Sequence, residues 1–205
     1  MVKTTIDQDG VPPEGRRVRA DAQRNLATVL QAAKEIFAEA GIDAPVRDIA
    51  DRAGVGIGTL YRHFPRRVDL LAAIFRQEMD ACADAAAALA AEHPPFEALE
   101  IWMQRFVELA ATKHGLAQAL QAGDPVYDAL AARRQQRLWP AFRALFDAAR
   151  ASGDIRSDIP SDDFLSAAAS LCRSVPNSPA QARRLVALLV NGLRHEDEPL
   201  RQPPL

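Results

Sequence analysis

The chain has 205 residues, 48% of them hydrophobic, which is enough to bury a substantial core in one large or two small domains. It contains no run of about 18 apolar residues and no apolar signal segment near its N-terminus, so we expect a cytoplasmic protein rather than a membrane or secreted one. The net charge of −2 is unevenly distributed along the chain. Residues 16–67 hold ten Lys and Arg against six Asp and Glu, whereas the remainder hold fifteen against twenty-one. A basic segment of this kind is typical of a polyanion-binding region or of a solvated basic face.

The N-terminal region predicts a leader followed by one helix. Residues 1–15 are polar and contain a Pro-Pro pair, which is typical of a disordered leader. From residue 21 apolar residues recur at helical spacing until Gly41, and glycine suits the left-handed position that ends many helices. We therefore expect the first helix over residues 21–41.

Two short helices follow. Pro45 has the backbone φ that the first turn of a helix requires, and Gly54 ends this segment after about two turns. The next segment covers residues 57–64 and stops at Pro65, because a helix interior cannot accommodate the proline ring. The turn between the two helices is the tripeptide Gly54-Val55-Gly56.

The rest of the chain has helical periodicity. We expect helices over residues 67–91, 96–113, 115–121, 125–151, 161–174 and 178–193. The tripeptide His93-Pro94-Pro95 separates the first two, and Ser178-Pro179-Ala180-Gln181 predicts a capping box with Pro at the first helical position. Because no window alternates as a strand, the predicted fold class is all-α, with about nine helices.

The segment with residues 46–67 is the most informative part of the sequence. Two short helices joined by a tight, glycine-containing turn are the elements of a helix-turn-helix, whose second helix presents its N-terminal end to the major groove of DNA. In this second helix Leu60 and Phe64 are four residues apart and are expected to pack inward. The side chains left outward carry hydroxyls, a guanidinium and an imidazole, which suit phosphates and base edges: Thr59, Tyr61, Arg62 and His63.

Three motifs follow one another here: Val46-Arg47-Asp48-Ile49-Ala50, Ala53-Gly54-Val55 and Gly58-Thr59-Leu60-Tyr61-Arg62-His63-Phe64. Together they closely resemble the DNA-binding head of TetR-family repressors, over roughly residues 22–75. The resemblance implies a helix-turn-helix domain over residues 16–66 and a helical ligand-binding and dimerisation domain over residues 67–195. Residues 196–205 are predicted to be a disordered tail. It also implies a bacterial homodimer that binds a palindromic operator in double-stranded DNA and leaves it when a small-molecule inducer binds.

Carried over position by position, the resemblance implies a set of residues that contact operator DNA. Arg67 stands where the family usually has a Lys that binds phosphate. Arg16, Arg17 and Arg19 precede the first predicted helix and form either a minor-groove arm or a solvated tail. The predicted DNA-binding residues are Arg47, Gly56, Ile57, Gly58, Thr59, Tyr61, Arg62, His63 and Arg67.

Two glycines depart from the family pattern or weaken the recognition helix. Gly56 replaces the Ser that commonly caps this helix, and glycine caps nearly as well but carries no hydroxyl for phosphate. Gly58 lowers helix stability by about 1 kcal/mol relative to Ala. From these two residues we infer a close approach of the backbone to DNA.

The resemblance also implies an inducer pocket and a dimer interface in the second domain. The candidate pocket residues are apolar or aromatic, or are polar anchors, although aromatic side chains at helical spacing are also typical of a plain core: Trp102, Met103, Arg105, Phe106, Gln118, Trp139, Phe142 and Phe146. The expected inducer is therefore apolar or aromatic. The candidate dimer residues lie on the last two helices: Phe164, Leu165, Ala168, Leu171, Leu185, Leu188 and Leu189.

Two other classes of protein fit the sequence less well. An enzyme is disfavoured because the four histidines form no metal-binding pair or catalytic constellation, and we expect no cofactor or metal. Cys82 and Cys172 lie in apolar helical patterns outside any Cys-x-x-Cys pair, which predicts buried free thiols. A helical interaction module without DNA binding is the second alternative.

Overall fold

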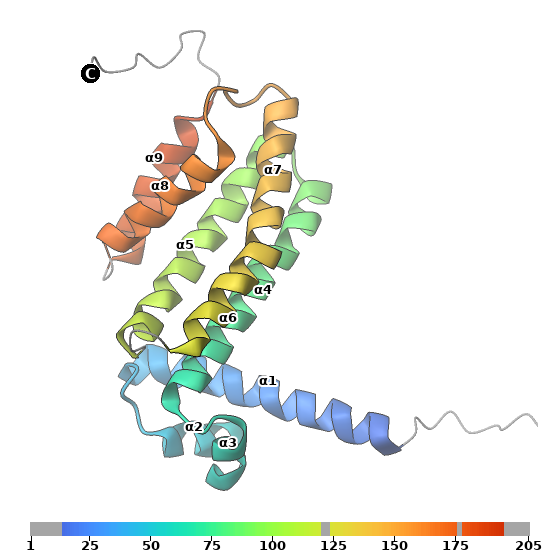
Figure 1. Cartoon of the computed structure of the whole chain (residues 1–205), viewed down its shortest axis with the longest axis vertical. Coiled ribbons are helices and arrows are strands. Elements are labelled where there is room, and N and C mark those ends of the chain that lie inside the picture. The colour runs from blue at the N-terminus through green and yellow to red at the C-terminus, as the bar shows by residue number, and fades with distance from the viewer. Residues whose placement is uncertain (1–13, 120–123, 176–177, 195–205) are drawn as a thin grey trace, which may run out of the picture. The chain divides into compact units, whose positions relative to one another are not determined.

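The computed structural model describes residues 14–119, 124–175 and 178–194 (Figure 1). The chain divides into two compact units, Met1–Arg66 and Arg67–Leu205. Within the described ranges every named element is helical, and an isolated antiparallel bridge joins Ile155 to Arg194. The all-α class is therefore confirmed. None of the described helices is long and apolar enough to cross a membrane.

The first unit contains three helices, α1 (Glu14–Ala40), α2 (Val46–Ala53) and α3 (Ile57–His63). Helix α2 packs against both α1 and α3. The core of the unit is formed by the apolar stripe of α1 together with the inner faces of the two short helices. Its buried residues include Val29, Leu30, Ala33, Ile36, Ile49, Ala50, Leu60 and Phe64.

Helix α1 begins earlier than the sequence pattern predicted. Residues 14–20 are helical although they add no apolar stripe, and Arg and Ala in this stretch are good helix formers. The arginines at positions 16, 17 and 19 are thus part of α1 rather than an arm ahead of it, and their side chains lie outside the described residues. Residues 1–13 of the predicted leader and the whole predicted tail lie outside them too.

The turn between α2 and α3 is built on Gly54, as expected. Its φ of 66° lies in the left-handed region. Its backbone N–H donates to the carbonyl of Asp51 and the N–H of Val55 donates to the carbonyl of Ala50, at 3.2 and 3.0 Å. This pair of bonds is a Schellman motif, which satisfies carbonyls at the end of α2 and turns the chain toward α3. Pro45 precedes α2 as its N-cap, one residue earlier than predicted.

The second unit consists of the remaining helices, and α5 packs against four of them: α4, α7, α8 and α9. Helices α8 and α9 lie side by side at one edge of this unit (Figure 1). The bounds are α4 (Arg67–Glu92), α5 (Pro95–Ala119), α6 (Pro125–Arg133), the π-helical turn η1 (Arg134–Leu138), α7 (Trp139–Ala151), α8 (Ser161–Ser174) and α9 (Pro179–Asn191).

An aromatic cluster fills the centre of the second unit. Trp102, Phe142, Phe146 and Phe164 are each at most 2% exposed, and neighbouring ring centroids lie 5.4–6.2 Å apart. The indole Nε1 of Trp102 donates to the carbonyl of Cys82 at 2.8 Å, so this buried donor is satisfied. The cluster joins α5, α7 and α8 into one core.

The structure corrects three predicted details of the second unit. Helix α5 continues through Gly115 to Ala119, so the separate helix predicted over residues 115–121 does not form in its described part. Ser178 precedes α9 with Pro179 at the first position, but its side chain makes no capping hydrogen bond. Helix α6 has a side-chain cap, because the Oδ1 of Asp124 accepts from the N–H of Val126 at 3.0 Å.

The predicted helix over residues 125–151 is interrupted by η1. In this turn the N–H of Trp139 donates to the carbonyl of Arg134, five residues back. The next residue, Pro140, has no N–H and its ring would crowd the carbonyl four residues before it. The extra residue in the turn is a π-bulge that relieves this conflict.

Candidate DNA-binding surface and ligand pocket

Helix α3 separates its side chains between core and solvent. Leu60 is 2% exposed and Phe64 is buried, whereas Tyr61 is 49% exposed. Gly56 is the N-cap, and its carbonyl accepts from the N–H groups of Thr59 and Leu60 at 2.9 and 3.2 Å. The sequence of α3 therefore turns one short face inward and leaves the other free for a partner.

The outward face of the head carries hydrogen-bond donors and positive charge. Thr59, Tyr61, Arg62 and His63 are exposed on α3, and Arg47 is exposed on α2. Ile57, Gly56 and Gly58 are exposed at the N-terminal end of the same helix. Arg67 is half-buried at the start of α4, in the second unit. Guanidinium, imidazole and hydroxyl groups are the groups that bind phosphates and base edges.

Arg52 differs from Arg47 and Arg62 because its charge is paired within the head. Its guanidinium donates two hydrogen bonds to the carboxylate of Glu39, at 2.8 and 3.0 Å, and thereby joins α2 to α1. The hydrogen bond from Arg52 lowers the pKa of Glu39. Arg52 is thus a structural arginine of the head, unlike Arg47 and Arg62.

The fold does not require glycine at positions 56 and 58. A Cβ built on Gly58 meets no atom within 4 Å, and one built on Gly56 lies 3.9 Å from the Oγ1 of Thr59. Neither residue has a positive φ. The head therefore has room for alanine at both positions, so packing within the head does not explain the two glycines.

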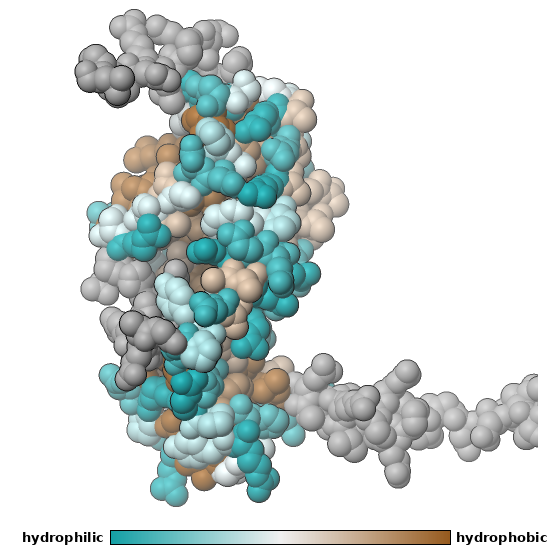
Figure 2. Space-filling view, viewed as in Figure 1, coloured by the Kyte–Doolittle hydropathy of each residue, from teal (hydrophilic) through white to brown (hydrophobic). Residues whose placement is uncertain are grey.

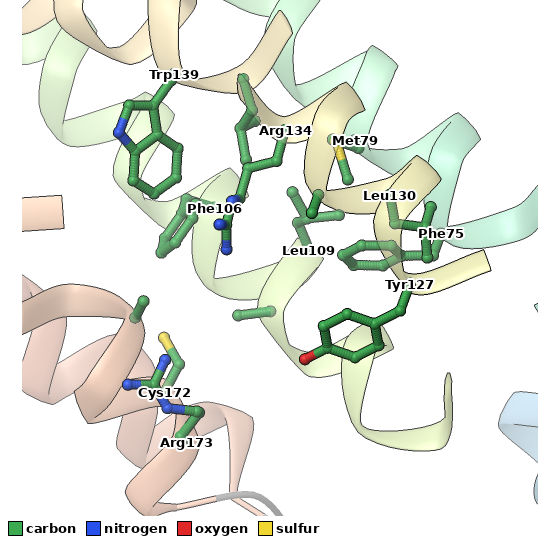
Figure 3. Close-up of a pocket in the computed structure, with 14 residues that line it drawn as sticks. Phe75, Met79, Phe106, Leu109, Tyr127, Leu130, Arg134, Trp139, Cys172 and Arg173 are labelled. Carbon is green, nitrogen blue, oxygen red and sulfur yellow. The ribbon is translucent and has the colours of Figure 1, made fainter. Parts of the chain in front are cut away.

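The second unit contains a pocket of about 410 Å³ (Figure 3). Its wall is mainly apolar and comes from α4, α5, α6, η1, α7 and α8. Phe75 and Met79 come from α4, Phe106 from α5 and Tyr127 from α6. A cavity of this size and lining is typical of a site for a small organic molecule.

The polar part of the pocket wall consists of two arginines, a tyrosine and a cysteine. Arg134 comes from η1 and its guanidinium carbon lies 5.1 Å from the centroid of the Trp139 ring. Cys172 and Arg173 come from α8. Burial raises the pKa of the Cys172 thiol, so it stays protonated at neutral pH.

Comparison with known proteins identifies both units. The family model described as bacterial regulatory proteins, tetR family, matches residues 29–74, and the model described as transcriptional regulator SbtR-like, C-terminal domain, matches residues 94–195. The TetR transcriptional regulator SCO0520 from Streptomyces coelicolor, known from a crystal structure, is 42% identical in sequence to this chain. The two structures superpose with a TM-score of 0.68, and the match covers 82% of this chain and 98% of that chain. The chain belongs to the TetR family of transcriptional regulators.

Other relatives agree with this assignment. The TetR transcription regulatory protein from Mycobacterium vanbaalenii is 35% identical with a TM-score of 0.65, covering 87% of this chain and 99% of that chain. The HTH-type transcriptional repressor KstR of Mycobacterium tuberculosis is 31% identical over 144 residues, which are 68% of this chain and 64% of KstR. The chain thus spans less than two thirds of the length of the curated relatives it matches.

Two of the predicted pocket residues line the pocket of this TetR-family regulator, namely Phe106 and Trp139. Trp102, Met103, Phe142 and Phe146 are instead fully buried in the core, and Arg105 is exposed on α5 away from the pocket wall. The side chain of Gln118 lies outside the described residues. Helical periodicity identifies the apolar face of a helix but does not tell core residues from residues of a cavity wall. The pocket prediction was therefore wrong for the residues that lie in the core.

Sequence reasoning missed most of the pocket's polar residues. Tyr127, Arg134 and Arg173 are not part of the apolar helical stripes, so periodicity does not predict that they line a cavity. A signal was nevertheless present for Arg134. Pro140 lies six residues later within a helical pattern, where a local distortion of the preceding turn is expected.

The predicted dimer residues separate into buried and surface groups. Phe164, Leu165 and Ala168 are at most 2% exposed within the core of their own unit, so these side chains are not available to a second copy. Leu188 is 69% exposed on α9. Leu171, Leu185 and Leu189 are partly exposed. Hydrophobic residues gather over the α8–α9 side of the second unit in Figure 2.

Proposed function

We propose that this TetR-family regulator is a dimeric repressor that acts in the bacterial cytoplasm, binds a palindromic operator and leaves it when a small molecule occupies the pocket. The observation that carries the proposal is the division of α3, in which Leu60 and Phe64 anchor the helix while Tyr61 and its polar neighbours face solvent. A helix presented in this way has the form required to enter a major groove.

The surface of α9 supports the dimer. Leu185, Leu188 and Leu189 lie at helical spacing on one face, and Leu188 is the most exposed large hydrophobic residue among those described. An exposed apolar stripe of this kind is stabilised by covering it with another helix. Two copies related by a twofold axis would place two heads on half-sites about one turn of DNA apart.

The DNA sequence can be found by selection from a random duplex library with the purified full-length chain. We expect the enriched duplexes to share an inverted repeat, and their affinity to fall steeply with rising salt because Lys and Arg displace counterions from phosphates. Failure to enrich any sequence, together with binding that does not depend on salt, would favour an interaction module without DNA binding.

The role of α3 is tested on a selected duplex with the Tyr61→Ala variant. We expect its affinity to fall about tenfold or more, since loss of one specific contact costs about 1–3 kcal/mol. Arg52→Gln is the matched control in the same head, because its guanidinium is bound to Glu39. Fluorescence anisotropy measures both affinities. Unchanged binding by the Tyr61 variant would contradict the proposed orientation of the head on DNA.

A further inference from the structure

The charges around η1 are distributed unevenly. Three arginines lie in or next to this turn, and two of them pair with carboxylates of α4. Arg133 donates two hydrogen bonds of 2.7 Å to Asp80, and Arg137 forms an ion pair with Asp84. The third, Arg134, lines the pocket and forms no ion pair with any residue that the structure describes.

The guanidinium of Arg134 also has an unused donor. Its Nε is shielded from solvent and has no hydrogen-bond partner. The Nε of Arg150 is in the same condition, but the guanidinium of that residue is held through its Nη2, which donates to the carbonyl of Ile159 at 2.9 Å. Among the described residues no hydrogen bond holds the guanidinium of Arg134. It contacts the ring of Trp139. Arg134 as a whole is partly exposed, so its guanidinium keeps its charge and offers an unpaired, shielded N–H donor at the pocket wall. Such a donor on a cation favours an anionic ligand.

The remaining pocket wall agrees with this charge. None of the described residues that line it is acidic. Arg173 lies on α8, and its Nη2 donates to the hydroxyl of Ser170 at 2.7 Å, with no carboxylate partner among the residues described. In Figure 3 Arg134 and Arg173 reach the pocket from different helices, with apolar side chains between them. As far as the structure describes its lining, the pocket therefore combines an apolar body with positive charge and has no negative charge to compete with a ligand.

We propose that the pocket binds an amphipathic organic anion, with an apolar body against the aromatic wall and a single carboxylate or phosphate paired with Arg134. The fork of N–H donors in a guanidinium matches the oxygens of either head group. The identification of this anion as the inducer rests on the proposed function, whereas its binding does not.

Isothermal titration calorimetry on the full chain without DNA tests the charge preference. The probes with one apolar body are octanoate, octyl phosphate, octanol and octylamine, and a ring-shaped pair is naphthoate and naphthalenemethanol. We expect at least one anion to bind about tenfold or more tightly than its alcohol, because hydrogen bonds between charged partners are the strong ones. Preference for octanoate or for octyl phosphate separates the two head groups.

The Arg134→Gln variant tests the residue. It should bind the acid no more tightly than the alcohol, while its unchanged affinity for the alcohol shows that the pocket is intact. Arg137→Gln is the matched control, because it removes an arginine of the same turn that does not line the pocket. Three results would overturn the proposal. The unmodified chain could bind acids and alcohols equally well, it could bind neither the acids nor octyl phosphate, or Arg134→Gln could keep the preference for the acid unchanged.

Operator binding distinguishes this inference from the proposed function. If an anion binds through Arg134 but the chain selects no DNA, the proposed function fails and the inference stands. If the chain binds its operator and a neutral or cationic compound releases it while no anion binds, the inference fails and the proposed function stands.

Discussion

Leu60 and Tyr61 are adjacent in the sequence but have opposite surroundings. Leu60 is 2% exposed and Tyr61 is 49% exposed. A helix of seven residues has only two turns, so a buried residue within it, Leu60, and a buried C-cap, Phe64, fix which way the other side chains face. The exposure of the Tyr61 side chain is therefore determined by the burial of Leu60 and Phe64 more than by the chemistry of the tyrosine.

Gly58 offers a way to separate helix stability from DNA binding. Because a Cβ at this position meets no atom, Gly58→Ala should raise the free energy of unfolding by up to about 1 kcal/mol. If the α3 backbone approaches DNA closely, the same change should weaken operator binding. Thermal unfolding and fluorescence anisotropy measure the two effects.

Gly54→Ala is the control for this experiment. The left-handed φ of Gly54 is strained for any residue with a Cβ, so the substitution should destabilise the head by about 1–2 kcal/mol. If Gly58→Ala bound operator as tightly as the unmodified chain, the inferred close approach would be wrong.

The two cysteines should react slowly with thiol reagents. Burial raises the pKa of Cys82 to about 12 and raises that of Cys172 as well. The thiolate is the reactive form, so at about pH 8 Cys82 should stay unmodified by iodoacetamide in the folded protein and react after denaturation. Cys172 lines the pocket and should react slowly, because its raised pKa keeps the thiolate scarce. Mass spectrometry of the intact protein measures this. Rapid modification of Cys82 in the folded chain would contradict its burial.

At the scale of elements, the sequence predicted most helices but not the interruption of the longest pattern. Apolar periodicity located the cores of α1 to α5, α8 and α9, and Gly54 marked the end of α2 because few residues other than glycine adopt its φ. Periodicity does not register backbone hydrogen bonds, so η1 was missed. It also cannot tell a residue that fills the core, such as Phe142, from one beside a cavity, such as Phe106.

Pro140 should control the position of Arg134. In Pro140→Ala a backbone N–H becomes available to the carbonyl of Gln136, which favours a regular α-helix over the π-helical turn. Losing the extra residue of the turn would rotate Arg134 by about 100° around the helix axis. We expect a higher thermal midpoint and weaker binding of the preferred anion, measured by calorimetry. Unchanged anion affinity would show that neighbouring helices, not Pro140, hold the turn open.

At the scale of the whole molecule, the proposed reading of a palindrome requires a second copy of the chain. The part of the candidate interface that the chain leaves on its surface is centred on Leu188, since Phe164, Leu165 and Ala168 are already used in the core. Sequence pattern alone could not make this division, because inward and outward apolar residues on α8 and α9 share the same helical spacing.

Leu188→Glu should therefore produce a monomer. A carboxylate in an apolar interface costs several kcal/mol, whereas on an exposed position of the monomer it costs little. Analytical ultracentrifugation should show half the mass of the unmodified protein, and operator affinity should fall because one head reads one half-site. Ala148→Glu, an exposed substitution on α7, is the control and should leave the mass unchanged. A dimeric Leu188 variant would place the interface elsewhere.

Helix α4 begins at the residue after the head ends and contributes Phe75 and Met79 to the pocket wall. If a ligand there lowers operator affinity, thermodynamic linkage requires the operator to lower ligand affinity by the same factor. Titrating the ligand in the presence and absence of saturating duplex would thus give the coupling free energy directly. The strength of the genetic switch would be known from two calorimetric curves, before any gene it controls is identified.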